Sequence, residues 1–124
     1  MLANKILVVD DDHDIGFMIQ TMLQYHGYDV MVTDKADQTL TILKQNQFNL
    51  IIMDMLMSGI NGTDICTSIK QDVSKNDMGV LMISAHPFAK ELCLQVGADE
   101  FVSKPFDMED MLTKIKKFAT PSQQ

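Results

Sequence analysis

Apolar residues recur along the chain in five short runs, and five stretches with helical spacing lie between or after them. The runs cover about Lys5–Val9, Tyr28–Thr33, Leu50–Met53, Val80–Ile83 and Phe101–Val102. The first is almost continuously apolar, which is typical of a strand buried on both faces. The second alternates apolar and polar residues and predicts an outer strand with one better-buried face. Strands that alternate with helices in this way predict a parallel sheet covered by helices on both faces.

The stretches between the runs place apolar residues on one side of each predicted helix. Asp34 and Asp107 precede the second and the fifth of these helices, and both are expected to be N-caps. The residues expected to face inward are Ile15, Met18, Ile19, Met22 and Leu23, then Ala36, Leu40 and Leu43, then Ile65, Ile69 and Val73, then Leu92, Cys93 and Val96, and finally Met108, Met111, Leu112, Ile115 and Phe118.

Charged residues follow three of the predicted strands. Asp10 and Asp11 follow the first strand, Asp54 follows the third, and Lys104 follows the fifth. The carboxyl ends of strands in an open parallel sheet converge on one crevice, so these side chains are expected to meet there. Neighbouring carboxylates in a poorly solvated crevice repel one another unless a cation neutralises them, and hard oxygen ligands favour Mg²⁺. The pattern therefore predicts a site for Mg²⁺, with Mn²⁺ as an alternative occupant.

Composition excludes several other classes of protein. A chain of 124 residues fits one domain, and a net charge of -7 argues against direct binding to nucleic acid, which needs a basic surface. No apolar run is long enough to span a membrane, and no signal peptide precedes the first strand, so a cytoplasmic location without membrane contact is expected. Cys66 and Cys93 lack metal-ligand spacing and are not expected to form a disulfide framework.

Six short motifs occur in a fixed order along the chain, and together they identify a resemblance. They are Val8-Val9-Asp10-Asp11, Ile51-Ile52-Met53-Asp54, Asn61-Gly62, Leu81-Met82-Ile83-Ser84-Ala85, Gly97-Ala98-Asp99 and Lys104-Pro105-Phe106. The chain resembles the receiver domain of two-component response regulators from Ile6 to about Phe118. The resemblance implies an α/β fold of the flavodoxin-like, doubly wound type, with five helices and a five-stranded parallel sheet in the order 2-1-3-4-5, as in the chemotaxis regulator of this family.

The resemblance also implies a role for each residue of the predicted crevice. Asp54 is the expected phosphoacceptor, whose carboxylate attacks a phosphoryl group to form an acyl phosphate. Asp10, Asp11, Asp54 and the backbone carbonyl of Leu56 are the expected metal ligands. The expected phosphoryl-binding groups are the Lys104 ammonium, the Ser84 hydroxyl and the Ala85 amide. Pro105 is expected to follow a cis peptide bond.

Signalling by such a domain depends on a conformational response. The resemblance implies that Ser84 and the aromatic residue on the fifth strand, here Phe101, act as the switch. The fourth helix, the fifth strand and the fifth helix form the expected surface for a downstream effector. The expected phosphodonor is a sensor histidine kinase or a histidine phosphotransfer protein, and the domain is expected to assist its own phosphorylation and dephosphorylation without being an enzyme.

Other interpretations stay open from sequence. Taken singly, Asp11 or Asp12 is more simply an N-cap, and Phe101 is equally well an ordinary core aromatic. The chain could also be a receiver-like binding module that takes no phosphate. A flavin- or nucleotide-binding protein of the same architecture needs a Gly-, Ser- or Thr-rich loop after the first strand, where this chain has Asp10-Asp11-Asp12.

Two further features concern the limits of the domain and the loop after Asp54. Residues 1–119 are expected to form the receiver domain, and residues 120–124 a tail or the start of a linker. Met57-Ser58 stands where relatives commonly have Met-Pro, so the rigid turn imposed by proline is absent and looser Mg²⁺ binding is expected.

Overall fold

A computed structural model of the chain describes residues 4–121, so the last three residues of the predicted tail and the first three of the predicted domain lie outside the described residues. Within residues 4–121, five parallel strands form one sheet in the order β2-β1-β3-β6-β7. These strands are β1 (Lys5–Val9), β2 (Asp29–Thr33), β3 (Leu50–Asp54), β6 (Gly79–Ser84) and β7 (Glu100–Ser103). Counted along the sequence, this order is the predicted 2-1-3-4-5, and it is confirmed.

Five α-helices, two 3₁₀ turns and a small hairpin complete the described part of the chain. The helices are α1 (His13–Tyr25), α2 (Thr39–Gln45), α3 (Gly62–Gln71), α4 (Ala89–Gln95) and α5 (Met108–Ile115). The 3₁₀ turns are η1 (Ala36–Gln38) and η2 (Val73–Lys75). The antiparallel hairpin consists of β4 (Leu56–Met57) and β5 (Ile60–Asn61), in a segment for which the sequence predicted a loop.

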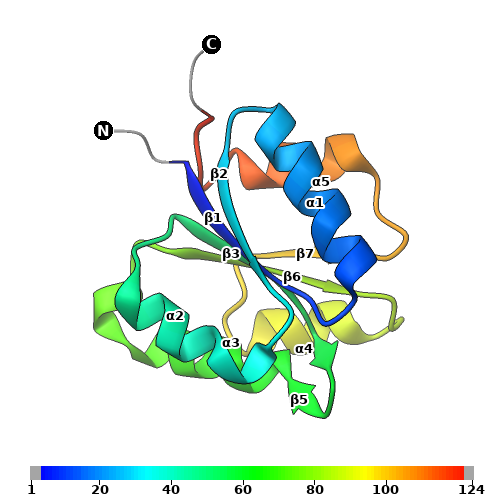
Figure 1. Cartoon of the computed structure of the whole chain (residues 1–124). Coiled ribbons are helices and arrows are strands. Elements are labelled where there is room, and N and C mark those ends of the chain that lie inside the picture. Colours follow the sequence, from blue (N-terminus) through cyan, green and yellow to red (C-terminus); the bar gives the residue numbers. More distant parts are fainter. Residues whose placement is uncertain (1–3, 122–124) are drawn as a thin grey trace.

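Helices cover the sheet on both faces: α1 and α5 lie on one, and α2, α3 and α4 lie on the other (Figure 1). The central strands divide their side chains between the two layers because successive residues of a strand point to opposite faces. In β3, for example, Leu50 and Ile52 belong to the cluster under α1 and α5, whereas Ile51 and Met53 belong to the cluster under the other three helices. Burial on both faces explains why the central strands are apolar runs without alternation.

The helix faces differ from the sequence prediction at four apolar residues. Met18 and Leu40 are each 40% exposed, Leu92 is 45% exposed and Val73 is 81% exposed, so their predicted inward orientation is wrong. The first three lie at the edge of an apolar stripe, and Val73 lies in η2, beyond the last residue of α3. Asp107 caps α5 as predicted, but Asp34 caps no helix. The segment after Asp34 begins with η1. The carboxylate of Asp34 instead contacts the imidazole of His13 at 2.6 Å.

Gly62, at the start of α3, packs closely against the backbone at Asp54. A Cβ atom there would lie 2.5 Å from the carbonyl oxygen of Asp54 and 2.9 Å from the Cε atom of Met82. Both distances are far inside van der Waals contact, and the Asp54 carbonyl belongs to the backbone and cannot simply rotate away. We expect Gly62→Ala to lower the free energy of unfolding by about 1–3 kcal/mol, measured by urea denaturation.

Gly16→Ala in α1 is the matched control for this prediction. Its added Cβ would meet one methyl group of Val32 at 3.2 Å, and alanine favours the helical backbone. The free energy of unfolding is therefore expected to change by less than about 1 kcal/mol. Equal losses of stability in the two variants would contradict the argument.

Candidate functional site

Three consecutive aspartates after β1 have three different sets of partners. Asp10 is only 2% exposed, and its Oδ1 atom accepts a hydrogen bond from the N–H of Asp12 at 2.9 Å. The Oδ2 atom of Asp11 accepts a hydrogen bond from the Ser58 hydroxyl at 2.8 Å. Asp12 is the N-cap of α1, where its carboxylate accepts from two N–H groups of the first turn. The N-cap interpretation therefore applies to Asp12 and leaves Asp10 and Asp11 for the crevice.

Asp54 lies at the carboxyl end of β3, which is the middle strand of the sheet. Its Oδ2 atom accepts a hydrogen bond from the Nζ atom of Lys104 at 3.1 Å. The same Nζ atom lies 3.8 Å from the Oδ2 atom of Asp10. The backbone of Lys104 is anchored as well, because its N–H donates to the carbonyl oxygen of Ser84 at 2.9 Å. The structure thus brings together charged residues from the ends of three strands.

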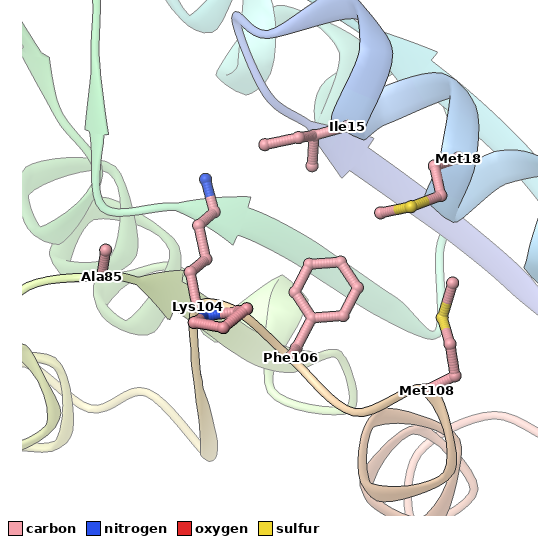
Figure 2. A pocket seen from close by; sticks show the side chains of 7 residues that line it. Ile15, Met18, Ala85, Lys104, Phe106 and Met108 are labelled. Atoms are coloured by element: carbon pink, nitrogen blue, oxygen red, sulfur yellow. The ribbon is translucent and has the colours of Figure 1, made fainter.

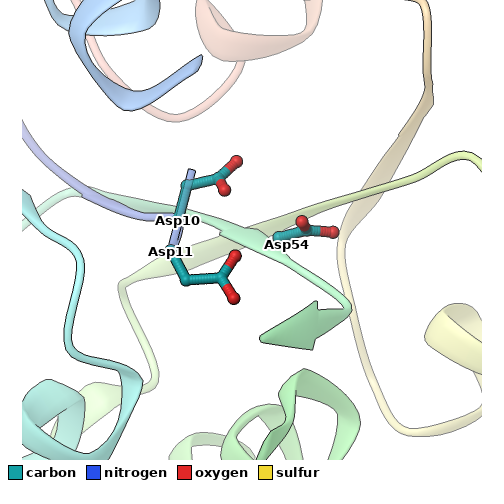
Figure 3. Close-up of side chains that lie close together, drawn as sticks. All are labelled: Asp10, Asp11 and Asp54. Carbon is teal, nitrogen blue, oxygen red and sulfur yellow. The ribbon is translucent and has the colours of Figure 1, made fainter. Parts of the chain in front are cut away.

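The side chains of Asp10, Asp11 and Asp54 converge on one small space (Figure 3). Each offers a carboxylate oxygen within 4.8 Å of the others, and the buried Oδ2 atom of Asp10 has no hydrogen-bond partner within residues 4–121. The Lys104 ammonium contacts two of these three carboxylates, those of Asp10 and Asp54, so the cluster carries excess negative charge. Oxygen donors at this separation, one of them unsatisfied, fit a divalent cation.

Burial raises the pKa of Asp10, because the charged form of this carboxyl loses the solvation of water. The N–H of Asp12 and the ammonium of Lys104 oppose this rise, whereas the negative charges of Asp54 and Asp11 add to it. Ionisation of Asp10 in the folded protein therefore costs more free energy than ionisation of an aspartate in water. A cation held against its free oxygen would reverse that effect.

Ser84 and Ala85 lie at the carboxyl end of β6, beside Lys104. Ser84 is 6% exposed, and its Oγ atom accepts a hydrogen bond from the N–H of His86 at 3.0 Å. This contact uses the oxygen as an acceptor and leaves the hydroxyl proton for another partner. Ala85 is exposed, and it borders a pocket that Lys104 also borders. Ser84 and Ala85, two of the three predicted phosphoryl-binding residues, therefore lie at the crevice beside the third, Lys104.

The hairpin after Asp54 contains a residue that the sequence did not identify as part of the site. Ser58 occupies its turn with a φ of 45°, followed by Gly59 with a φ of 82°, and its hydroxyl donates to Asp11 across 47 positions of sequence. Pairing of β4 with β5 holds this turn without proline. No motif could have indicated the contact, because it depends on how the hairpin folds over the loop after β1. Leu56, the predicted carbonyl ligand, lies in β4 with its side chain 60% exposed.

Comparison with known proteins decides the family. Residues 6–116 match the family described as "Response regulator receiver domain". The chain belongs to this family. The chain is 32% identical over 117 residues to the nisin biosynthesis regulatory protein NisR of Lactococcus lactis, and this match covers 93% of the chain and 50% of NisR. It thus spans about half the length of the curated relatives it matches.

Solved receiver structures have the same fold. A putative response regulator from Chloroflexus aurantiacus superposes with a TM-score of 0.87 at 26% identity, over 93% of this chain and 96% of that one. The chemotaxis protein CheY4 of Vibrio cholerae gives a TM-score of 0.84 at 26% identity, over 93% of this chain and 98% of that one. The chain is therefore a receiver domain of the two-component signalling type, and neither the flavin-binding nor the unphosphorylated alternative is favoured.

Two further predicted residues of the receiver domain lie on or just after β7. The Lys104-Pro105 peptide bond is cis, as predicted. Phe101 is 8% exposed and packs in the cluster under α2, α3 and α4, while its carbonyl oxygen accepts a hydrogen bond from Lys114 of α5 at 3.0 Å. Its role as a switch stays a prediction. Within residues 4–121, the receiver domain has no helix with the length and apolar character needed to cross a membrane.

Proposed function

We propose that this receiver domain is a phosphorylation-dependent switch in which Asp54 accepts a phosphoryl group. The observation that supports this most directly is the position of the Asp54 carboxylate, 3.1 Å from the Lys104 ammonium and beside two further carboxylates. Phosphoryl transfer needs a nucleophile and positive charge around the equatorial oxygens of phosphorus. Asp54 supplies the nucleophile, and Lys104 supplies one of the positive charges.

Mg²⁺, or Mn²⁺ in its place, is the proposed cofactor, held by Asp10, Asp11, Asp54 and the backbone carbonyl of Leu56. When bound, such a cation neutralises the carboxylates and the charge of the incoming phosphoryl group. The free oxygen of Asp10 and the hydrogen bond that orients Asp11 support this assignment. The ammonium group of Lys104 also lies within 4 Å of two of the proposed ligand groups, the Oδ2 atoms of Asp10 and Asp54. The lysine and the metal ion would therefore both interact with these two carboxylates.

Each remaining residue of the crevice has a proposed task during transfer. An Oδ atom of Asp54 attacks phosphorus while the bond from phosphorus to the donor breaks, and the donor keeps the bonding electrons. Lys104 then binds a phosphoryl oxygen instead of the Asp54 carboxylate. The hydroxyl proton of Ser84 and the amide of Ala85 donate to the remaining oxygens. The domain is a phosphoacceptor that assists its own modification and is not an enzyme acting on a separate substrate.

Histidine phosphotransfer proteins and sensor histidine kinases are the proposed phosphodonors. One structural neighbour, with a TM-score of 0.85 at 17% identity, is the receiver domain of the Saccharomyces cerevisiae regulator Ssk1, solved with the histidine phosphotransfer protein Ypd1. Phosphorylation adds negative charge that draws Ser84 and its loop inward. The surface of α4, β7 and α5, which includes Phe101, would then present an altered face to a downstream effector, without direct contact to nucleic acid.

The test is to incubate the protein with acetyl phosphate and Mg²⁺ and to weigh it by intact-protein mass spectrometry. We expect a mass gain of one phosphoryl group in the native protein. The gain should disappear in Asp54→Asn and when EDTA replaces Mg²⁺. Asp77→Asn, at an exposed aspartate away from the crevice, should be phosphorylated as the native protein is. An unmodified native protein, or a mass gain that survives in Asp54→Asn, would refute the proposal.

A further inference from the structure

An apolar pocket opens directly beside the phosphorylation crevice. It has a volume of about 490 Å³ and lies between α1, the segment after β7 and the first residue of α5. Figure 2 shows Ile15 and Met18 on one side of it, Phe106 and Met108 on the other, and Lys104 at one end. Among the residues that line it, only Lys104 carries a charge.

Lys104 and Ala85 connect this pocket to the reaction. Both line the pocket, and both are proposed to bind the phosphoryl group. The Nζ atom of Lys104 is also 3.1 Å from the oxygen of Asp54 that would attack. A molecule whose phosphoryl group is held by these residues can therefore extend its remaining part into the pocket. That remaining part is the leaving group, because only the phosphoryl group passes to Asp54 and the rest of the donor departs.

The side chains that line the pocket favour an apolar leaving group. Met and Phe side chains bind apolar groups of varied shape, and beyond Lys104 the pocket has no charged side chain to bind a polar one. The acetyl group of acetyl phosphate offers a single methyl group to a pocket of this size. A longer acyl chain would remove more apolar surface from water, both its own and that of Met18, which is 40% exposed.

We propose that this receiver domain takes small-molecule phosphoryl groups preferentially from acyl phosphates with an apolar acyl chain longer than acetyl, and that the chain lies in this pocket. The inference rests on the proposed function. The Asp54 carboxylate forms the new O–P bond, the bond between phosphorus and the acyl oxygen breaks, and the carboxylate of the donor leaves with the electron pair. No oxidant and no proton transfer are needed, because the leaving carboxylate is stable as an anion.

The experiment compares acetyl, butyryl and hexanoyl phosphate, which have leaving groups of similar intrinsic reactivity. Initial rates of phosphorylation are measured by intact mass at equal, subsaturating concentrations with Mg²⁺. We expect the rate constant to rise along the series, by at least about tenfold from acetyl to hexanoyl phosphate. Met18→Gln and Met108→Gln each place a polar amide at the pocket and should reduce this preference, measured as the ratio of the rate with hexanoyl phosphate to the rate with acetyl phosphate.

Met31→Gln is the control, because Met31 is a similarly exposed methionine, at 36%, on β2 and outside the pocket. It should retain the preference. Equal rates with the three donors would overturn the inference and leave the proposed function intact. A preference that persists in both pocket variants would overturn the assignment to this pocket. Failure of all three donors to phosphorylate Asp54 would refute the proposed function itself, and the inference with it.

Discussion

Replacing Lys104 by methionine is expected to slow phosphorylation of Asp54 by at least about a hundredfold, because a preorganised positive charge is lost from the position where phosphoryl charge develops. Methionine keeps much of the length and apolar stem of lysine, so the adjoining pocket remains filled on that side. The ammonium group, 3.1 Å from Asp54 and 3.8 Å from Asp10, is what disappears. The measurement is the initial rate with acetyl phosphate and Mg²⁺.

Loss of the charge must be separated from loss of the fold in this experiment. Without Lys104, the carboxylates of Asp10 and Asp54 face each other uncompensated, so the variant should also be less stable in the absence of metal. Rates are therefore compared with excess Mg²⁺, after circular dichroism has shown a folded domain. Lys90→Met, on the exposed side of α4, should have the native rate. A native rate in Lys104→Met would show that the lysine has no part in phosphoryl transfer.

Replacing Asp10 by asparagine is expected to stabilise the metal-free protein and to abolish most of its stabilisation by Mg²⁺. The Oδ1 atom of asparagine can still accept from the N–H of Asp12, so the local turn is retained. The substitution removes a buried charge that has an unsatisfied oxygen and two negative neighbours. A gain on the order of 1 kcal/mol would raise the Tm of a domain of this size by about 3–6 °C.

The pH dependence of stability gives this prediction a definite sign. The pKa of Asp10 is raised in the folded state, so the fold binds this proton more tightly than the unfolded chain does. The free energy of unfolding of the metal-free protein should therefore fall as the pH rises from the ordinary aspartate value of 3.8 through the raised pKa. In Asp10→Asn, the part of the decrease in the free energy of unfolding that arises from titration of Asp10 should be absent.

Thermal unfolding in EDTA and in excess Mg²⁺, repeated from acidic to neutral pH, measures all of these effects. Binding to the folded state alone raises the Tm of the native protein with Mg²⁺ concentration, and this rise should be small in Asp10→Asn. Asp77→Asn is the control and should respond to Mg²⁺ as the native protein does. A lower Tm for Asp10→Asn in EDTA would mean that the buried carboxylate stabilises the metal-free fold.

The sequence was sufficient to predict the sheet and the main residues of the crevice, for a physical reason. Strands buried on both faces must be apolar, so a charged residue at the carboxyl end of such a run marks where the run stops. Asp10, Asp54 and Lys104 mark three such ends, and parallel strand order brings them to the same edge. The alternation of strands and helices agrees with the observed chain path, and Gly27 and Gly59, both with positive φ, lie in turns along it.

Features that depend on contacts distant in sequence were not predictable. Helical spacing identified the apolar side of α1, α2 and α4, but only packing shows that Met18, Leu40 and Leu92 lie at an uncovered edge. The pairing of β4 with β5 spans too few residues to leave a pattern. The hydrogen bond from Ser58 to Asp11 forms only once that hairpin has folded back, and it gives a polar residue of the turn a place beside the proposed metal ligands.

The outer edge of β7 is occupied by side chains of the same molecule. Lys114 donates to the carbonyl oxygen of Phe101, and Lys117 contacts the carboxylate of Glu100 at 2.5 Å, so two lysines lie along a strand that has a sheet neighbour on only one side. Cations at such an edge discourage a strand from another chain from adding to the sheet. Two copies that meet at this border would therefore have to join through helix and side-chain contacts, and the domain is protected there against the continuous strand addition that leads to fibres.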